Sequence, residues 1–208
     1  MQLFRKPADY AAFERAMEKT LETCPLRICS YVLMPNHWHL VVWPERDGEL
    51  AAFMQKLTIT HVRNWQVHRR KVGEGHVYQG RYKSFPIETD DYFYHVARYV
   101  EANPWRAKLA TSASGWQWGS LWRREHGDSE SRRWLSKWPL PQPRDWARIV
   151  AGAQPKSQRD QIRRSVRRGQ PYGGEAWTQA AAIELELQST LRQRGRPRKP
   201  AELSPQNN

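Results

Sequence analysis

The chain has 208 residues, of which 39% are hydrophobic, and its formal net charge is +13. This length suits one globular domain with appendages, and no stretch approaches the roughly 18 apolar residues that a membrane-spanning helix needs. A balance this basic favours a polyanionic partner, nucleic acid before an anionic membrane. No signal peptide is recognisable and Cys24 and Cys29 match no zinc or disulfide pattern, so we expect a cytoplasmic, nucleoid-associated protein with reduced thiols.

The first 45 residues predict a helix followed by a β-hairpin. Residues 9–23 place Tyr10, Phe13 and Met17 on one helical face, with Asp9 as the expected N-cap. Residues 27–34 and 37–43 are rich in β-forming side chains, and the Pro-Asn pair between them is typical of a turn.

The next 60 residues predict a helix, a strand and a second helix. The first helix covers residues 49–71 and is expected to end at Gly73 and Gly75. Residues 77–87 read as a third strand, and Asp90 or Asp91 caps a helix that runs to about Ala102. The order predicts an α+β fold, with helices on one face of an antiparallel sheet.

The rest of the chain has a different character. Six of the eleven Trp residues fall within residues 111–146, which predicts an irregular segment that packs by its indoles. Basic and amphipathic helices follow over 157–168 and 175–191. We therefore expect four parts: a core (1–110), a Trp- and Pro-rich connecting segment (111–156), a basic helical DNA-binding segment (157–194) and a disordered tail (195–208).

His37 and His39 form the first candidate site. Because side chains alternate along a strand, both imidazoles project from one face, and Trp38 and Leu40 project from the other. Two neighbouring imidazoles are a ready pair of metal ligands. The alternative is that they are two polar positions on the wet face of a hairpin.

Tyr99 and Asn103 form the second candidate site. They are four residues apart, so they share one face of a helix. A phenol facing two histidines could act as a nucleophile, and the amide oxygen beside it could be a third metal ligand. The alternative is a half-buried core tyrosine followed by an ordinary helix-ending asparagine.

Three pieces of the chain, taken in order, resemble the REP-associated tyrosine transposases, a branch of the one-tyrosine HUH transposases. The resemblance covers about residues 3–122. The pieces are Tyr-Val-Leu-Met-Pro-Asn-His-Trp-His-Leu-Val-Val (31–42), Tyr-Gln-Gly-Arg-Tyr-Lys-Ser (78–84) and Arg-Tyr-Val-Glu-Ala-Asn-Pro-Trp-Arg-Ala (98–107). The strand that opens the family pattern, ahead of the first helix, has no counterpart here. We expect its absence to leave a sheet edge exposed.

The resemblance implies a ferredoxin-like sheet and a catalytic domain over residues 1–110. It implies that His37, His39 and Asn103 hold a divalent ion, Mg²⁺ or Mn²⁺, while Tyr99 attacks DNA. The attack would leave a 5′-phosphotyrosine link and release a 3′-hydroxyl. The substrate would be single-stranded DNA folded into palindromic repeat hairpins, and the sequence leaves open whether the enzyme is a monomer or a homodimer.

Basic side chains near the C-terminus predict how DNA is held. Residues 142–208 carry 13 Lys and Arg against 6 Asp and Glu. The basic helix offers a stripe of phosphate contacts, and the Arg-Gly-Arg-Pro core that follows resembles an AT-hook, which lays arginines along a minor groove. The alternatives are a solvated helix face and a merely basic tail. The residues concerned are Arg159, Arg163, Arg164, Arg167 and Arg168 in the helix and Arg194, Arg196, Arg198 and Lys199 in the tail.

Two further functions compete with strand transfer. A domesticated, non-catalytic protein could bind repeat DNA with the same basic segments, and a metal-dependent hydrolase could use His37 and His39 without a covalent step. Only strand transfer requires Tyr99 and leaves protein attached to DNA.

Overall fold

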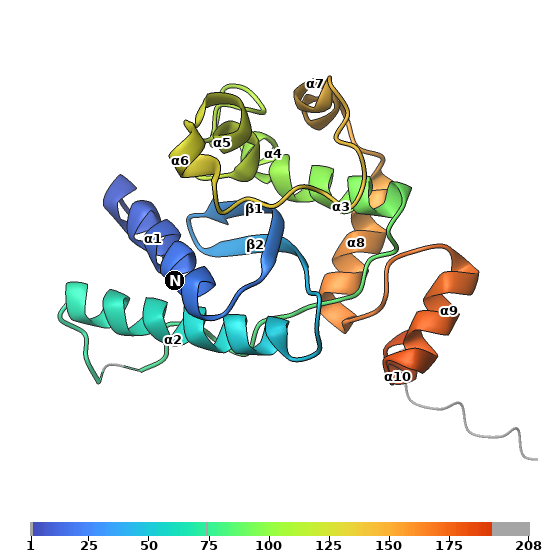
Figure 1. The fold of residues 1–208 in the computed structure, drawn as a ribbon, viewed down its shortest axis with the longest axis horizontal. Coiled ribbons are helices and arrows are strands. Elements are labelled where there is room, and N and C mark those ends of the chain that lie inside the picture. The colour runs from blue at the N-terminus through green and yellow to red at the C-terminus, as the bar shows by residue number, and fades with distance from the viewer. Residues whose placement is uncertain (1, 74, 193–208) are drawn as a thin grey trace, which may run out of the picture.

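The computed structural model describes residues 2–73 and 75–192. Figure 1 shows a β-hairpin, β1 (Arg27–Met34) and β2 (His37–Trp43), between two groups of helices. The strands pair antiparallel with Met34 opposite His37, which confirms the predicted hairpin at its predicted bounds and the α+β class.

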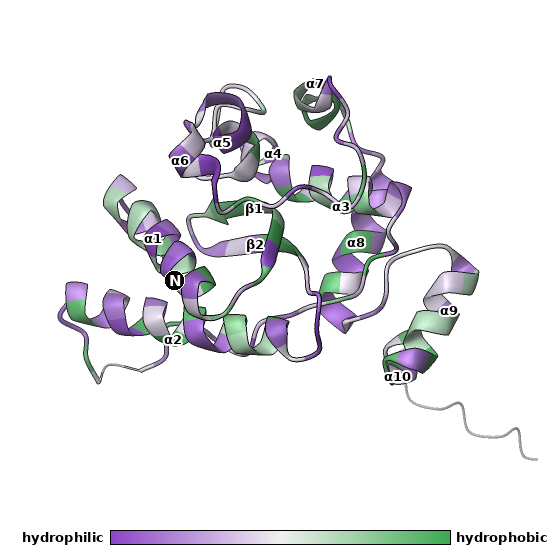
Figure 2. Cartoon of the chain, in the orientation of Figure 1, coloured by the Kyte–Doolittle hydropathy of each residue, from purple (hydrophilic) through white to green (hydrophobic). Residues whose placement is uncertain are grey.

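The helices lie on both faces of the hairpin, where the sequence predicted one. The α1–α2 core lies on the first face and includes Phe13, Ile28, Tyr31, Leu33, Phe53 and Leu57. The α3 core lies on the other and includes Val32, Met34, Val41, Phe93, Val96, Val100, Trp138, Trp146 and Ile162. A β-bulge between Ile28 and Ser30 shifts the alternation, so Ile28 faces the same way as Tyr31 and Leu33. Both faces of β1 are therefore buried, and Figure 2 shows β1 as largely hydrophobic.

The helices α1 (Pro7–Thr23) and α2 (Glu49–His68) differ from the prediction at their ends. Asp9 is not the N-cap: its carboxylate accepts hydrogen bonds from the backbone N–H groups of Arg5 and Lys6, which makes Lys6 the cap. The second helix ends three residues early, before the predicted glycines, because the chain turns at Arg70, whose φ of 52° is left-handed.

The predicted third strand over residues 77–87 is wrong. Only Ile87 makes an isolated bridge, to Tyr172, and residues 79–84 are exposed. Tyr78 anchors the segment through its side chain instead, since its hydroxyl accepts from the Trp38 indole at 3.1 Å and lies 2.6 Å from Nδ1 of His61. β-Forming residues make a strand only where a sheet edge is free to pair with them.

The free edge of β1 is used by the connecting segment. The Leu33 N–H donates to the Trp118 carbonyl at 2.9 Å, and the Ser136 N–H donates to the Ile28 carbonyl at 2.9 Å. The family pattern places its first strand beside β2, the other edge of the hairpin, so these contacts leave the expectation of an exposed edge there a prediction. The connecting segment contains short helices within residues 120–151 where the sequence predicted irregular structure, and its backbone supplies the hydrogen bonds at the β1 edge.

The remaining helices lie mostly above and to the right of the hairpin in Figure 1. The predicted helix over 175–191 is broken, because Glu186 adopts a left-handed φ of 55° between its two parts. Within residues 2–73 and 75–192, no helix is both long and apolar enough to cross a membrane. The bounds are α3 (Asp91–Glu101), α4 (Asn103–Arg106), α5 (Ser120–His126), α6 (Ser129–Arg132), α7 (Trp146–Ala151), α8 (Lys156–Arg168), α9 (Glu175–Glu184) and α10 (Gln188–Leu191).

A buried carboxyl group fixes α3 against the hairpin. Glu101 is 3% exposed and accepts hydrogen bonds from the hydroxyls of Ser30 and Ser120 and from the Trp146 indole. These partners come from β1, α5 and α7, so one side chain joins four elements. The network holds α3, and with it Tyr99, at a fixed position over the strands.

The buried imidazole of His61 predicts an acid-sensitive fold. His61 is 5% exposed, and burial lowers its pKa to about 4 despite the nearby charge of Asp9. The unfolded chain takes up this proton near pH 6.5, so the stabilisation is complete above that pH and is lost as pH falls towards about 4. We expect the His61 contribution to the free energy of unfolding to drop by about 2 kcal/mol between about pH 7.5 and pH 5.

Urea denaturation of the wild type and of His61→Gln at those two pH values measures this contribution. The glutamine variant should be less sensitive to acid than the wild type by the same amount. Equal pH sensitivity of the two proteins would show that His61 is not the group that titrates.

Candidate active site

The histidine pair lies on the face of β2 that α3 covers. Trp38 and Leu40, which alternate with the histidines, pack into the α1–α2 core on the opposite face. The ring centroids of His37 and His39 are 5.0 Å apart and the rings are nearly perpendicular, at 83°. Imidazoles that share one ion, each about 2.1 Å from the metal, have ring centres about 5 Å apart. The pair therefore fits a shared divalent cation.

Hydrogen bonding leaves one nitrogen of His37 available as a ligand. Nδ1 of His37 lies 2.7 Å from Oδ1 of Asn36. An amide oxygen can only accept, so Nδ1 carries the proton and the lone pair is on Nε2. Asn36 thus orients the ring through Nδ1 and leaves Nε2 as the nitrogen with a free lone pair.

The half-buried His39 is neutral at physiological pH. Burial, together with the positive charge of Arg106 and the neighbouring His37, lowers its pKa to about 4. A neutral imidazole keeps the lone pair that a metal ion needs.

Tyr99 reaches His39 from the last turn of α3. Its ring centroid is 6.2 Å from that of His39, and the residue is 8% exposed. The Arg106 guanidinium lies over the phenol ring at 4.7 Å and donates to the Tyr99 carbonyl at 2.9 Å. The structure therefore brings together His37, His39 and Tyr99, three residues that the sequence singled out.

Asn103 lies one turn beyond Tyr99 but is engaged with its own helix. Its amide nitrogen donates to the carbonyls of Tyr99 and Val100, and its oxygen accepts from Arg106 at 3.0 Å. No third His, Cys, Asp or Glu of the described chain joins His37 and His39 in a metal-binding group. An amide oxygen remains the candidate for the third protein ligand, on the same face as Tyr99.

Arg106 and Arg98 are the site residues that sequence reasoning missed. Arg106 follows Tyr99 by seven residues but lies in α4, beyond the helix end predicted near Ala102, so the predicted helix could not place it beside the phenol. Arg98 adjoins Tyr99 in the chain, and burial lowers its pKa. The chain has 34 Lys and Arg residues, and no local sequence pattern distinguishes these two arginines from the others.

The basic helix α8 packs beside this site. Gln158 on α8 lies 3.1 Å from the imidazole of His95 on α3, and Ile162 is buried in the α3 core. Of the five predicted DNA-contacting arginines, Arg159 and Arg168 are half-buried and the other three are exposed. They occupy two sides of the helix, because Arg164 and Arg168 are offset from the ridge of Arg159, Arg163 and Arg167. The tail residues Arg194, Arg196, Arg198 and Lys199 lie outside the described residues.

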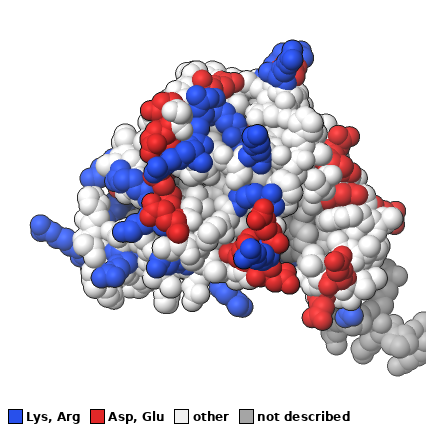
Figure 3. Space-filling view, viewed as in Figure 1, with Lys and Arg blue, Asp and Glu red and all other residues white. Residues whose placement is uncertain are grey.

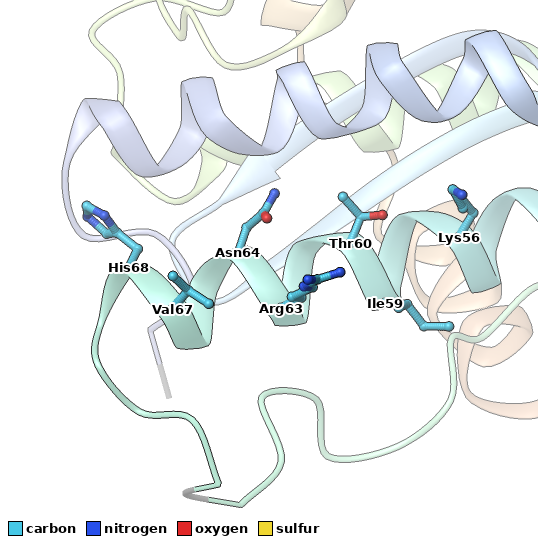
Figure 4. Close-up of a pocket in the computed structure, with 7 residues that line it drawn as sticks. All are labelled: Lys56, Ile59, Thr60, Arg63, Asn64, Val67 and His68. Atoms are coloured by element: carbon cyan, nitrogen blue, oxygen red, sulfur yellow. The ribbon is translucent and has the colours of Figure 1, made fainter.

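The face seen in Figure 3 carries charges of both signs, and a shallow hollow lies along α2. In Figure 3, basic side chains gather over the side of α1, α2, α5 and α6, interspersed with acids, while acids prevail near α9. The hollow in Figure 4 is lined only by α2 residues, from Lys56 to His68. The hollow includes neither the histidine pair nor Tyr99.

Comparison with known proteins relates half of the chain to one family. Residues 1–103 match the model of a family described as "Transposase IS200 like". The matched segment contains His37, His39, Tyr99 and Asn103. Searches among curated proteins and among solved structures found no match.

Proposed function

From the match of residues 1–103, which supports a transposase of the IS200-like family, we propose that this chain cuts and rejoins single-stranded DNA through Tyr99. The observation that carries the proposal is the meeting of Tyr99 on α3 with the two imidazoles on β2. The same residues lie within the three sequence pieces that resemble the REP-associated branch, so we assign the chain to that branch.

Tyr99 is the proposed nucleophile. Its phenol oxygen attacks the phosphorus of a DNA phosphodiester and forms a bond to it, while the bond from phosphorus to the 3′ oxygen breaks. The phenol loses its proton and the departing 3′ oxygen gains one, which leaves a 5′-phosphotyrosine and a free 3′-hydroxyl. Rejoining is the reverse attack by a 3′-hydroxyl.

His37 and His39 are the proposed metal ligands, with the oxygen of Asn103 as the third. The amide oxygen suits Mg²⁺ and Mn²⁺, and the imidazoles suit first-row transition ions, so this ligand set does not select one metal. A bound divalent ion would stabilise the negative charge that develops on the phosphate. The chain's own contribution is to hold two neutral imidazoles on β2 and a phenol on α3, which Glu101 fixes against the hairpin through Ser30 of β1.

Basic groups are proposed to hold the rest of the DNA. The arginines of α8 are positioned to contact backbone phosphates, which fix orientation without reading sequence. A basic tail would extend the contact to a neighbouring groove, and hairpins of repetitive palindromes are the proposed substrates.

The test is a covalent adduct. Purified full-length protein is incubated with Mn²⁺ and a labelled single-stranded palindromic hairpin from its own genome, and the products are separated under denaturing conditions. A labelled band at the size of protein plus DNA is expected. Binding without an adduct would overturn strand transfer and favour a non-catalytic repeat-binding protein, and cleavage without an adduct would favour a hydrolase.

A further inference from the structure

Arginines from two distant parts of the chain lie where α8 packs against α3, one helical turn from Tyr99. Arg98 and Arg106 come from α3 and α4, whereas Arg159 and Arg163 come from α8. Burial lowers the pKa of Arg106, and the positive charges of Arg159, Arg163 and Arg98 lower it further. Arg106 lies over the Tyr99 ring at 4.7 Å, so the guanidinium that feels these three charges contacts the proposed nucleophile.

This arginine cluster (Arg98, Arg106, Arg159 and Arg163) is short of negative charge. Among the described residues, only Arg163 has an acidic partner, the exposed Asp160 at 3.3 Å. Buried nitrogens with no hydrogen-bond partner in the described chain occur in the other three: Nε of Arg98, Nη1 of Arg106 and Nε of Arg159. Holding like charges and unsatisfied hydrogen-bond donors close together costs free energy unless an anion binds between them.

The cluster is held in place by packing. Gln154, just before α8, and Gln158 within it both contact His95 on α3, through its carbonyl and its ring respectively. Ile162 and Ser165 are buried between the helices. Arg159 and Arg163 are four residues apart, so they follow one ridge at the edge of that buried face.

We propose that Arg98, Arg106, Arg159 and Arg163 form a site for one or two backbone phosphates of single-stranded DNA, next to Tyr99. Fixed guanidinium forks match phosphate oxygens closely. α8 is then part of the active site and not a separate DNA-holding module, although it lies outside the matched residues 1–103. The proposal rests on the proposed function for the identity of the anion, since a strand presented to Tyr99 must place a phosphate there.

The test compares two double variants with the same loss of charge. Arg159→Gln/Arg163→Gln removes the α8 half of the site. Arg15→Gln/Arg63→Gln removes two exposed arginines from α1 and α2, on the other side of the hairpin. The probe is a fluorescein-labelled single-stranded oligonucleotide of mixed sequence, and binding is followed by anisotropy at several salt concentrations without divalent metal.

The α8 variant is expected to bind about tenfold more weakly at low salt. The slope of its log K against log salt concentration should flatten by about 1.4, the value expected for the loss of two phosphate contacts on a single strand. The α1–α2 variant should stay within about twofold of the wild type. Arg159→Lys/Arg163→Lys should recover part of the binding, because charge returns without the planar fork. With a neutral methylphosphonate backbone, the wild type and the α8 variant should bind equally.

Equal losses in the two double variants would overturn the site and show that net charge alone binds DNA. Thermal melting checks that the variants fold, and Arg163→Gln alone, at an exposed position, should show about half of the change in slope. The binding assay involves no cleavage. If no adduct ever forms but the α8 variant still loses binding selectively, the phosphate site stands and the tyrosine chemistry fails. If the adduct forms and the two variants bind alike, the tyrosine chemistry stands and the phosphate site fails.

Discussion

Tyr99→Phe is expected to abolish the covalent protein–DNA adduct and to reduce strand cleavage by three orders of magnitude or more, because it removes the attacking oxygen. The phenylalanine ring keeps the contact with His39 and the position under the Arg106 guanidinium, so DNA binding and thermal stability should change little. Adduct formation on denaturing gels and anisotropy on the same preparation separate the two effects.

Tyr92→Phe is the matched control for this experiment. Tyr92 lies on the same helix but packs against Tyr172, at a ring distance of 5.1 Å, away from the histidine pair. It should form the adduct at the wild-type rate. An adduct that persists in Tyr99→Phe and is lost in Tyr92→Phe would move the nucleophile to the other tyrosine.

The second large effect is expected from the histidine pair. His37→Ala/His39→Ala should lose both tight Mn²⁺ binding and adduct formation, because the two imidazoles are the only nitrogen ligands proposed for the ion. Paramagnetic resonance of free Mn²⁺ measures binding directly and does not depend on activity. Chelation of the wild type should likewise stop the adduct, and added Mn²⁺ should restore it.

His68→Ala provides the control for that experiment. His68 is exposed at the end of α2, remote from β2, and should leave Mn²⁺ binding unchanged. Full retention of Mn²⁺ by the double variant would show that the ion, if it is used, binds elsewhere. Where the double variant does lose Mn²⁺, Asn103→Ala separates the amide from the imidazoles, since loss of the amide should weaken Mn²⁺ binding without removing it.

The local elements were predictable because they depend on short-range patterns. The hairpin over β1 and β2 was predicted at its observed bounds, since turn residues and β-formers act within a few positions. The start of α3 followed from Asp90, whose side chain accepts from the Tyr92 N–H. The third strand failed for the opposite reason, because residues 77–87 are β-forming but a strand also needs a partner edge.

The sequence alone also determined which chemistry to look for. Spacing of two residues in a strand puts two imidazoles on one face, and spacing of four in a helix puts Tyr99 beside Asn103. These relations depend only on backbone periodicity, which local sequence controls. These spacings do not determine whether the histidine face of the strand and the tyrosine face of the helix meet in the folded protein.

Only the tertiary structure determines that the histidine pair and Tyr99 come together, and it also places α8 beside them. Glu101 joins α3 to β1, α5 and α7 through partners up to 71 residues away, which no local pattern reveals. The Trp-rich segment closes the free edge of β1, and α8 packs on α3 through Gln158 and Ile162, so the charge of Arg159 acts on Arg106. Contacts over such separations depend on how buried surfaces fit together, so the sequence named the histidines and the tyrosine, and only the fold brought the arginines to them.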